Sequence, residues 1–251
     1  MKKMLNIDYF GDSHPLHSLD IYFPDITDFY TIVYFHGGGL KEGNKDEVLK
    51  FMSLVDKGIC IASVAYRLIP DAEFPDFLYD GAKAVSHIIE HIKEFGGNGR
   101  IFIAGSSAGA YITMMLCLDR SYLEDYGVPK NAICGFISES AQQFAHFNLL
   151  EQRGFDSRLE RIDETAPFYY VKNGISIKPL LLLYYSDDMP CRPEENQLMF
   201  KSIKRFLPEN SIVDICEIEG EHCHPHNIYT LIDAIYGFIC KCVDSIDKLD
   251  F

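Results

Sequence analysis

The sequence has few positive charges for its size, and it has no apolar run long enough to cross a membrane. Its 23 lysine and arginine residues stand against 37 aspartate and glutamate residues, which gives a formal net charge of -14. An acidic surface of this kind repels phosphate backbones and anionic lipid headgroups. The longest apolar stretches, Ala110 to Leu118 and Pro179 to Tyr185, are far shorter than the roughly 20 residues of a transmembrane helix. We therefore expect neither a nucleic acid nor a membrane as partner.

The apolar segment of a secretory signal is also missing near the N-terminus, where Lys2 and Lys3 are soon followed by the polar run Asn6-Ile7-Asp8. We therefore expect a cytoplasmic protein.

Eight cysteines could form a disulfide framework, but free thiols in apolar runs usually pack as small hydrophobic side chains. Four of the eight lie in such runs, namely Cys60, Cys117, Cys134 and Cys216. We expect these cysteines to be reduced.

The 251 residues, 47% hydrophobic and 24% charged, are typical of a globular protein, and we expect a single domain over residues 1–251. Eight short runs have the length and composition of strands. They are Met4 to Tyr9, Leu19 to Phe23, Tyr30 to Phe35, Cys60 to Tyr66, Ile101 to Ala104, Ala132 to Ser138, Pro179 to Tyr185 and Ile212 to Ile218. The first two are close enough for a hairpin across Gly11-Asp12-Ser13, whereas helical periodicity in the later gaps indicates parallel crossovers. The fold class is therefore α/β, with a mostly parallel eight-stranded sheet flanked by helices.

Five segments between these strands have apolar residues at helical spacing. They are Lys45 to Asp56, Phe77 to Phe95, Ala108 to Leu118, Glu194 to Phe206 and Asn227 to Ser245. The stretch Gln142 to Glu164 fits no strand or long helix, and a loop of this length is more often a lid or a binding loop than a linker. We interpret residues 142–165 as a small lid or substrate loop.

The strongest chemical signal is Gly105-Ser106-Ser107-Ala108-Gly109, between a predicted strand and a predicted helix. A nucleophile elbow needs this context, because it presents a serine on a strained strand-to-helix turn while the flanking glycines let the backbone pack closely. The alternative is a serine N-cap of an ordinary helix.

A second motif, His36-Gly37-Gly38-Gly39, follows the strand Thr31 to Phe35, and such glycines can turn their N–H groups into one concavity that suits an oxyanion. A flexible turn or a phosphate cradle would be the alternative, but the Lys-Ser/Thr ending of a phosphate loop is missing.

Together these motifs resemble the hormone-sensitive-lipase-like and acetyl-esterase branch of the α/β-hydrolases. The likeness extends to Tyr66-Arg67-Leu68-Ile69-Pro70 and Phe74-Pro75 and covers nearly the whole chain. It implies hydrolysis of short-chain acyl esters by Ser107, a histidine and an aspartate, with no cofactor and no metal. It also implies an oxyanion hole formed by the amides of Gly38, Gly39 and Ala108.

The acid of such a triad follows a late strand, where Tyr185-Ser186-Asp187-Asp188 closes the run from Pro179. Asp187 and Asp188 compete for the role, and the spacing to Cys191 and Pro193-Glu194 resembles the family pattern better from Asp188. Tyr185 departs from the glycine that this pattern has three residues before the acid. Glu139, after another strand, is a third candidate.

The base follows the last strand, in the chain order Ser, Asp, His of this fold. Gly220-Glu221-His222-Cys223-His224-Pro225-His226 offers three histidines, and the family pattern, with its histidine just after a glycine, favours His222 over His224. A zinc site is the rival interpretation of this cluster, although no second cluster supplies further ligands. His36 is expected to anchor its own glycine loop by a hydrogen bond.

The site residues thus predict a serine carboxylesterase of the acetyl-esterase type that acts on a small-molecule ester, with acetylated carbohydrates implied by the resemblance alone. Only 35 residues precede His36, so we expect no large cap domain, and short acyl groups. Four apolar residues of the lid could line the acyl pocket or could simply pack the loop against the domain: Phe144, Phe147, Leu149 and Leu150. Amide or formamide hydrolysis on the same fold and a non-catalytic ligand-binding relative are the alternatives, and the oligomeric state is left open.

Overall fold

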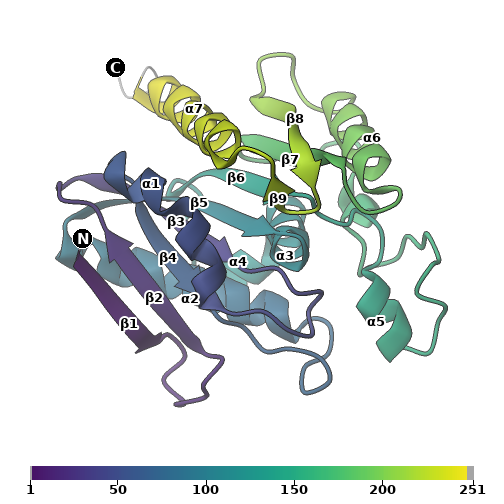
Figure 1. Ribbon diagram of the computed structural model, residues 1–251, viewed down its shortest axis with the longest axis horizontal. Helices are drawn as coiled ribbons and strands as arrows, with labels where there is room; N and C mark the ends of the chain where they lie inside the picture. Colours follow the sequence, from purple (N-terminus) through teal and green to yellow (C-terminus); the bar gives the residue numbers. More distant parts are fainter. Residues whose placement is uncertain (1, 248–251) are drawn as a thin grey trace.

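The computed structural model describes residues 2–247 and places all of their strands in one nine-stranded sheet (Figure 1). The order across the sheet is β1-β2-β4-β3-β5-β6-β7-β8-β9. The strands are β1 (Lys2–Asp8), β2 (Ser18–Phe23), β3 (Phe29–Phe35), β4 (Cys60–Val64), β5 (Gly97–Ser106), β6 (Ile133–Glu139), β7 (Leu180–Asp187), β8 (Val213–Glu221) and β9 (His224–Pro225).

Strands β3 to β8 are parallel, whereas β1 and β2 add to one edge and β9 to the other in antiparallel fashion. The prediction of a mostly parallel sheet with a hairpin at its start is therefore confirmed. The ninth strand was not predicted, because two residues are too few to show an alternating pattern. It pairs Gly220 with Pro225 and Glu221 with His224, so that His222 and Cys223 form the turn of a tight hairpin.

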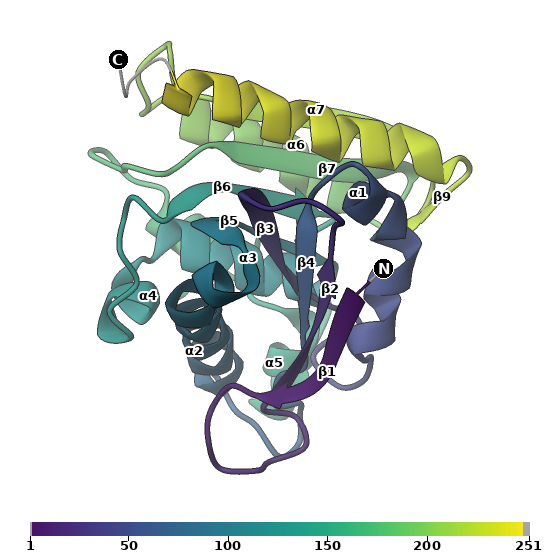
Figure 2. The ribbon, with the colours of Figure 1, turned by 90° about the vertical axis from the view of Figure 1, so that its left-hand side faces the viewer.

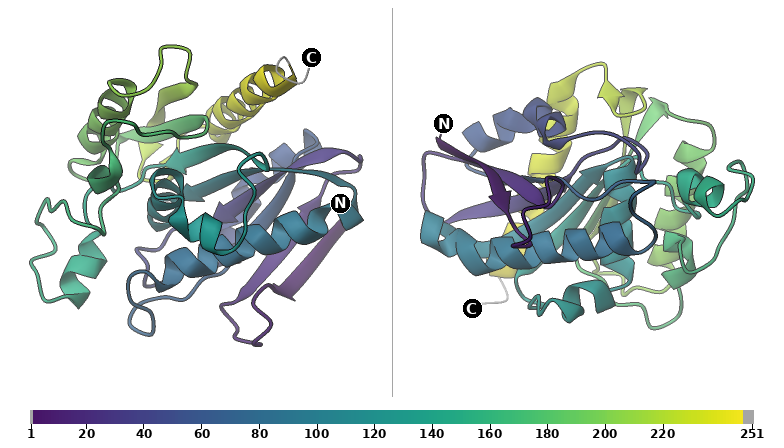
Figure 3. Two further views of the ribbon diagram at one scale, coloured as in Figure 1. Left: turned by 180° about the vertical axis from the view of Figure 1, so that it is seen from behind. Right: turned by 90° about the horizontal axis from the view of Figure 1, so that it is seen from below.

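Helices cover both faces of the sheet, as Figures 2 and 3 show. The α-helices are α1 (Met52–Asp56), α2 (Asp76–His91), α3 (Ala108–Leu118), α4 (Ser121–Asp125), α5 (Phe147–Gln152), α6 (Arg192–Lys204) and α7 (Ile228–Asp247). Three 3-10 segments accompany them, η1 (Lys45–Phe51), η2 (Ile92–Phe95) and η3 (Pro167–Tyr170). Apolar side chains of α2, α3 and α6 share one buried cluster with one face of the sheet, and those of α1 and α7 share a second cluster with the other face. The sheet is thus buried on both sides, as parallel strands require.

All five predicted helices are present; α3 has the predicted bounds, and those of α2, α6 and α7 are shifted. The segment from Lys45 divides into η1 and α1, with the Asn44 side chain accepting a hydrogen bond from the Asp46 N–H as its N-cap. The segment from Phe77 ends as η2, where Gly96 takes φ 95°, a left-handed conformation that favours glycine. Within the predicted lid, α5 forms a helix of 6 residues, and it lies outside the layers that sandwich the sheet (Figure 1).

All eight cysteines are free thiols, and Cys60, Cys117, Cys134 and Cys242 are buried. Cys216, which we expected in the core, is only half-buried. Burial raises the pKa of the Cys60 and Cys242 thiols to about 12, so both stay protonated at neutral pH. Among residues 2–247, no helix is both long and apolar enough to cross a membrane.

Candidate active site

Ser107 occupies a sharp turn between β5 and α3. Its backbone has φ 52° and ψ -113°, a conformation that costs free energy for any residue except glycine. Two contacts fix the turn: the Ser107 N–H donates to the Glu139 carbonyl oxygen at 2.8 Å, and α3 packs tightly against β3. At Gly109 a Cβ atom would lie 2.0 Å from the Phe35 carbonyl oxygen, so only glycine permits this approach. The pentapeptide therefore has the geometry of a nucleophile elbow.

Ser107, His222 and Asp188 lie in one hydrogen-bonded line although they are distant along the chain. His222 Nε2 is 2.8 Å from Ser107 Oγ, and His222 Nδ1 is 2.5 Å from Asp188 Oδ1. A proton on Nδ1 that is donated to Asp188 leaves Nε2 free to accept from the serine hydroxyl. The three side chains come from the carboxyl ends of β5, β7 and β8, the edge where open α/β sheets place their sites.

Asp188 is held by more than the histidine. Its side chain is fully buried, and its Oδ2 accepts hydrogen bonds from Ser140 Oγ at 2.6 Å and from the Tyr185 N–H at 3.1 Å. Burial alone would raise the pKa of Asp188, but the hydrogen bonds from His222 and Ser140 hold it below its ordinary value. Ser140 Oγ also lies 3.0 Å from His222 Nδ1. Ser140 was not predicted from the sequence, although it directly follows β6, at the edge of the sheet where site residues lie.

The competing candidates lie elsewhere. Asp187 is exposed at the end of β7, and His224 is exposed with its Nδ1 2.8 Å from the His222 carbonyl oxygen. Glu139 is buried, but its carboxylate contacts Ser106 and Tyr185 rather than a histidine. Among residues 2–247, no three His, Cys, Asp or Glu side chains are arranged as a metal-binding set.

The glycine-rich loop after β3 faces the elbow. The Gly37 N–H is committed to Glu47 Oε2 at 2.7 Å, which leaves the amides of Gly38, Gly39 and Ala108 as the candidates for an oxyanion hole. Gly38 has φ 98°, and a Cβ atom there would lie 2.1 Å from the Glu42 carbonyl oxygen. The loop conformation is thus available only to glycine at this position.

His36 anchors this loop by a side-chain hydrogen bond, as expected from the sequence. Its Nδ1 contacts the Gly37 carbonyl oxygen at 2.8 Å, and its ring stacks on Tyr66 with centroids 4.4 Å apart. Tyr66 Oη in turn donates to the His36 carbonyl oxygen at 2.8 Å. Burial lowers the pKa of His36 and so keeps the ring neutral, as a structural role requires.

Helix α5 is fastened to the same loop. Asn148 Nδ2 donates to the Gly39 carbonyl oxygen at 2.6 Å, and Lys41 forms an exposed ion pair with Glu151 at 2.5 Å. The Phe147 ring lies 3.6 Å from where a Gly39 Cβ would be, whereas Leu149 and Leu150 are buried in the domain. Phe144 packs against Phe168 of η3 with ring centroids 5.3 Å apart. Of the four apolar residues proposed for the acyl pocket, Phe147 is therefore the one placed against the glycine loop.

His146 is the N-cap of α5 and provides a pH-dependent contribution to stability. Its Nδ1 accepts from the Asn148 N–H at 3.3 Å, and burial lowers the pKa of its ring to about 3. Below a pH of about 6.5 the unfolded chain therefore binds a proton that the folded chain rejects, and stability falls as the pH falls toward 3.

We expect His146→Asn, which keeps an N-cap acceptor, to unfold more readily than wild type at pH 7.5 and to lose less stability on acidification. Urea unfolding at pH 7.5 and at pH 5 measures this. The difference in free energy of unfolding between the two proteins should shrink by about 2 kcal/mol between pH 7.5 and pH 5. An unchanged difference would mean that His146 takes up its proton in the folded state as readily as in the unfolded one.

The sequence matches the BD-FAE family over residues 19–145, a stretch that includes the glycine-rich loop and the elbow. The chain belongs to the BD-FAE family. Among curated proteins, this BD-FAE chain is 31% identical over 118 residues to the probable isoprenylcysteine alpha-carbonyl methylesterase ICMEL2 of Arabidopsis thaliana, which covers 45% of this chain and 28% of that protein. It is 32% identical over 101 residues to the acetyl esterase of Salmonella paratyphi B, covering 39% of this chain and 31% of that protein. The chain thus matches less than a third of the length of these curated relatives.

Solved structures show that the BD-FAE chain has the α/β-hydrolase fold, which confirms the fold class and the resemblance to esterases of this fold. Esterase B from Lactobacillus rhamnosis superposes with a TM-score of 0.81 at 16% identity, over 99% of this chain and 88% of that one. A truncated form of a carbohydrate esterase from gut microbiota superposes with a TM-score of 0.77 at 14% identity, over 97% of each chain.

Proposed function

We propose that this protein is a serine hydrolase of short-chain carboxylic esters, with Ser107 as nucleophile, His222 as general base and Asp188 as the acid that orients the histidine. The proposal depends on one observation, the line of hydrogen bonds from Ser107 Oγ through both nitrogens of His222 to the buried carboxylate of Asp188. The esterase names of the relatives and of the structural neighbours support the choice of ester substrates.

In the proposed reaction, Ser107 Oγ attacks the carbonyl carbon of the ester while His222 Nε2 takes the serine proton. Asp188 holds the imidazole in the productive tautomer and stabilises the imidazolium. The amides of Gly38, Gly39 and Ala108 donate to the oxyanion, and donors of this kind are each worth about 3 to 4 kcal/mol of transition-state stabilisation. His222 then protonates the leaving alcohol, and a water molecule repeats the cycle on the acyl-enzyme to release the acid.

We infer that the acyl group is short and that the natural substrate belongs to the acetyl esters, acetylated carbohydrates included. Phe147 supports the first part, because its ring lies close to Gly39 and α5 is tied to the glycine loop by Asn148. A wall fixed so near the proposed oxyanion hole limits the length of the acyl chain. The acetyl esterase of Salmonella and the carbohydrate esterase of the gut microbiota support the second part.

We expect kcat/KM to fall from acetyl and butyryl to hexanoyl and octanoyl p-nitrophenyl esters. Phe147→Ala should raise the hexanoyl-to-acetyl ratio of kcat/KM by about 10-fold, because it removes the side of the pocket wall that a longer chain would strike. Tyr169→Ala, which removes an exposed aromatic ring from η3, is the matched control and should leave the ratio unchanged. A wild-type profile that rises with chain length would contradict the short-chain proposal, and sole activity on an N-formyl amide in the same panel would contradict ester hydrolysis.

A further inference from the structure

Glu139 is a buried carboxylate beside the elbow that the proposed reaction does not use. It ends β6, it is 2% exposed, and its two carboxylate oxygens accept hydrogen bonds from Ser106 Oγ and Tyr185 Oη. Its own carbonyl oxygen accepts from the Ser107 N–H at 2.8 Å. Main chain and side chain of one residue thus both contact the turn that presents the proposed nucleophile.

Lys50 balances the charge of this carboxylate and extends its reach to the histidine. Lys50 Nζ lies 3.3 Å from Glu139 Oε2 and donates to the Cys223 carbonyl oxygen at 3.5 Å, one residue beyond His222. Burial by itself lowers the pKa of Lys50, but Glu139 and Glu47 raise it above its ordinary value. The ammonium therefore stays charged between the hairpin turn and β6.

A second branch leads to the glycine-rich loop. Tyr34 Oη lies 2.7 Å from Ser106 Oγ and donates to Glu47 Oε1 at 2.8 Å, and Glu47 Oε2 accepts from the Gly37 N–H. Burial raises the pKa of Tyr34 well above its ordinary value, so the phenol remains a hydrogen-bond donor at all ordinary pH values. Glu139 is therefore connected, through side chains alone, to the loop that supplies Gly38 and Gly39.

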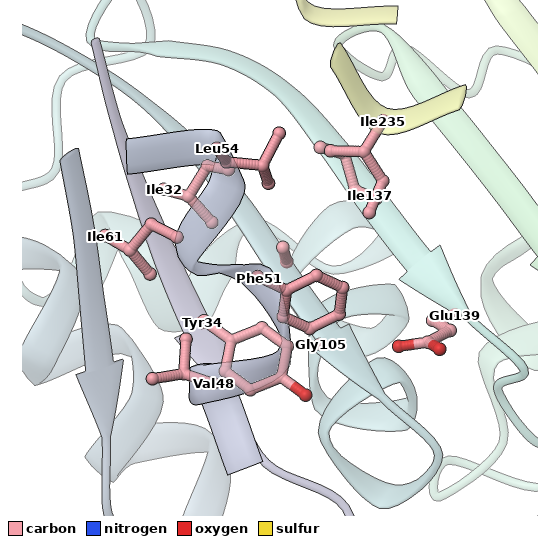
Figure 4. A pocket seen from close by; sticks show the side chains of 11 residues that line it. Ile32, Tyr34, Val48, Phe51, Leu54, Ile61, Gly105, Ile137, Glu139 and Ile235 are labelled. Carbon is pink, nitrogen blue, oxygen red and sulfur yellow. The ribbon is translucent and has the colours of Figure 1, made fainter. Parts of the chain in front are cut away.

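The surroundings make these contacts hard to exchange for water. Behind Glu139 lies a cavity of about 20 Å³, room for about one water molecule, which is lined mainly by apolar side chains. Figure 4 shows the Tyr34 phenol and the Glu139 carboxylate at one end of it and the aliphatic side chains of Ile32, Leu54 and Ile137 toward the other. Because the lining is mainly apolar, it offers a water molecule few further partners, so water is a poor replacement for a donor that Glu139 loses.

We propose that Glu139 is a positioning residue for the proposed ester hydrolysis, holding four segments of the site in one geometry through a buried polar network. The segments are the elbow through Ser106, the end of β7 through Tyr185, the His222 turn through Lys50, and the glycine-rich loop through Tyr34 and Glu47. This inference rests on the proposed function. It assigns to Glu139 a role through other residues, with no contact to the substrate.

The test is Glu139→Gln, which keeps the size of the side chain but removes its charge and one acceptor. We expect kcat per active site, with sites counted by fluorophosphonate titration, to fall 10- to 100-fold while KM changes less than 2-fold. Counting sites removes the effect of any unfolded fraction. The rate constant of fluorophosphonate labelling should fall in parallel, because it reports the alignment of Ser107 with His222 and the oxyanion donors.

Asp80→Asn is the matched control. Asp80 lies on α2, is as buried as Glu139, and forms an ion pair with Arg67 at 2.7 Å. It should lower the melting temperature and leave kcat per titrated site unchanged. If Glu139→Gln does not fold, Tyr185→Phe and Ser106→Ala each remove one donor and should lower kcat per site about 3- to 10-fold.

Wild-type kcat per site in a folded Glu139→Gln, or in both single-donor variants, would overturn the positioning role while leaving ester hydrolysis intact. A wild-type protein that neither hydrolyses esters nor reacts with the probe would instead overturn the proposed function, so the two failures can be distinguished.

Discussion

Replacing Ser107 with alanine is expected to lower p-nitrophenyl acetate hydrolysis at least about 10⁴-fold. The acyl-enzyme cannot form without the hydroxyl, and the remaining oxyanion donors and binding contacts supply only a small residual rate in comparable hydrolases. The fold should not change, because Ser107 makes its structural contact through its N–H to Glu139, which alanine retains. Initial rates at saturating substrate, with circular dichroism of both proteins, measure the effect.

Ser121→Ala is the matched control for this substitution. Ser121 begins α4 on the surface, where its hydroxyl donates to Asp119 Oδ1 at 2.7 Å, and the variant should keep full activity. Fluorophosphonate should label the wild type and Ser121→Ala and leave Ser107→Ala unlabelled. Substantial hydrolysis by Ser107→Ala would show that the reaction runs through another nucleophile or through none.

Asp188→Asn is expected to lower kcat about 10⁴-fold with little change in KM. An asparagine in this place presents its NH₂ group to His222 Nδ1, which favours the tautomer with the proton on Nε2. That tautomer cannot accept the proton of Ser107. The effect should be large because the Asp188 side chain is fully buried and its carboxylate is the partner of His222 Nδ1.

Asp187→Asn makes the comparison specific, since it applies the same chemical change one residue earlier. Asp187 is exposed at the end of β7, and its substitution should change kcat less than about 2-fold. A larger loss in Asp187→Asn than in Asp188→Asn would transfer the role of acid to Asp187 and would contradict the geometry described above.

Much of the fold can be predicted from local patterns. Alternating and buried apolar runs located eight strands, and the helical spacing between them indicated parallel crossovers. Helices α4 and α5, with 5 and 6 residues, were missed because one and a half turns hold too few apolar positions to show a period. Strand β9 was missed for the same reason, since its existence depends on pairing with β8 and not on its own composition.

In the candidate site, too, the residues with a local sequence signal were predicted and those that depend on remote partners were not. Ser107 and the glycine-rich loop can be recognised in the sequence because their backbone conformations require glycines at neighbouring positions. The choice of Asp188 over Asp187 depends instead on the direction in which each side chain points at the end of the strand. Ser140, Glu47 and Lys50 gave no signal, because each contributes through a partner that is remote in sequence. Glu139 did give a signal, as a carboxylate after a strand, but its environment places it away from the histidine.

The hairpin that carries His222 has a consequence for the proposed reaction. The imidazole stands on a two-residue turn between the backbone pairs Gly220–Pro225 and Glu221–His224, and its Nδ1 lies 2.5 Å from Asp188 Oδ1, so the hairpin and the carboxylate together hold the ring in place. In the proposed reaction, a base held in this way is in position before the ester binds. The free energy of substrate binding is then available to stabilise the transition state, because none of it is needed to order the catalytic groups.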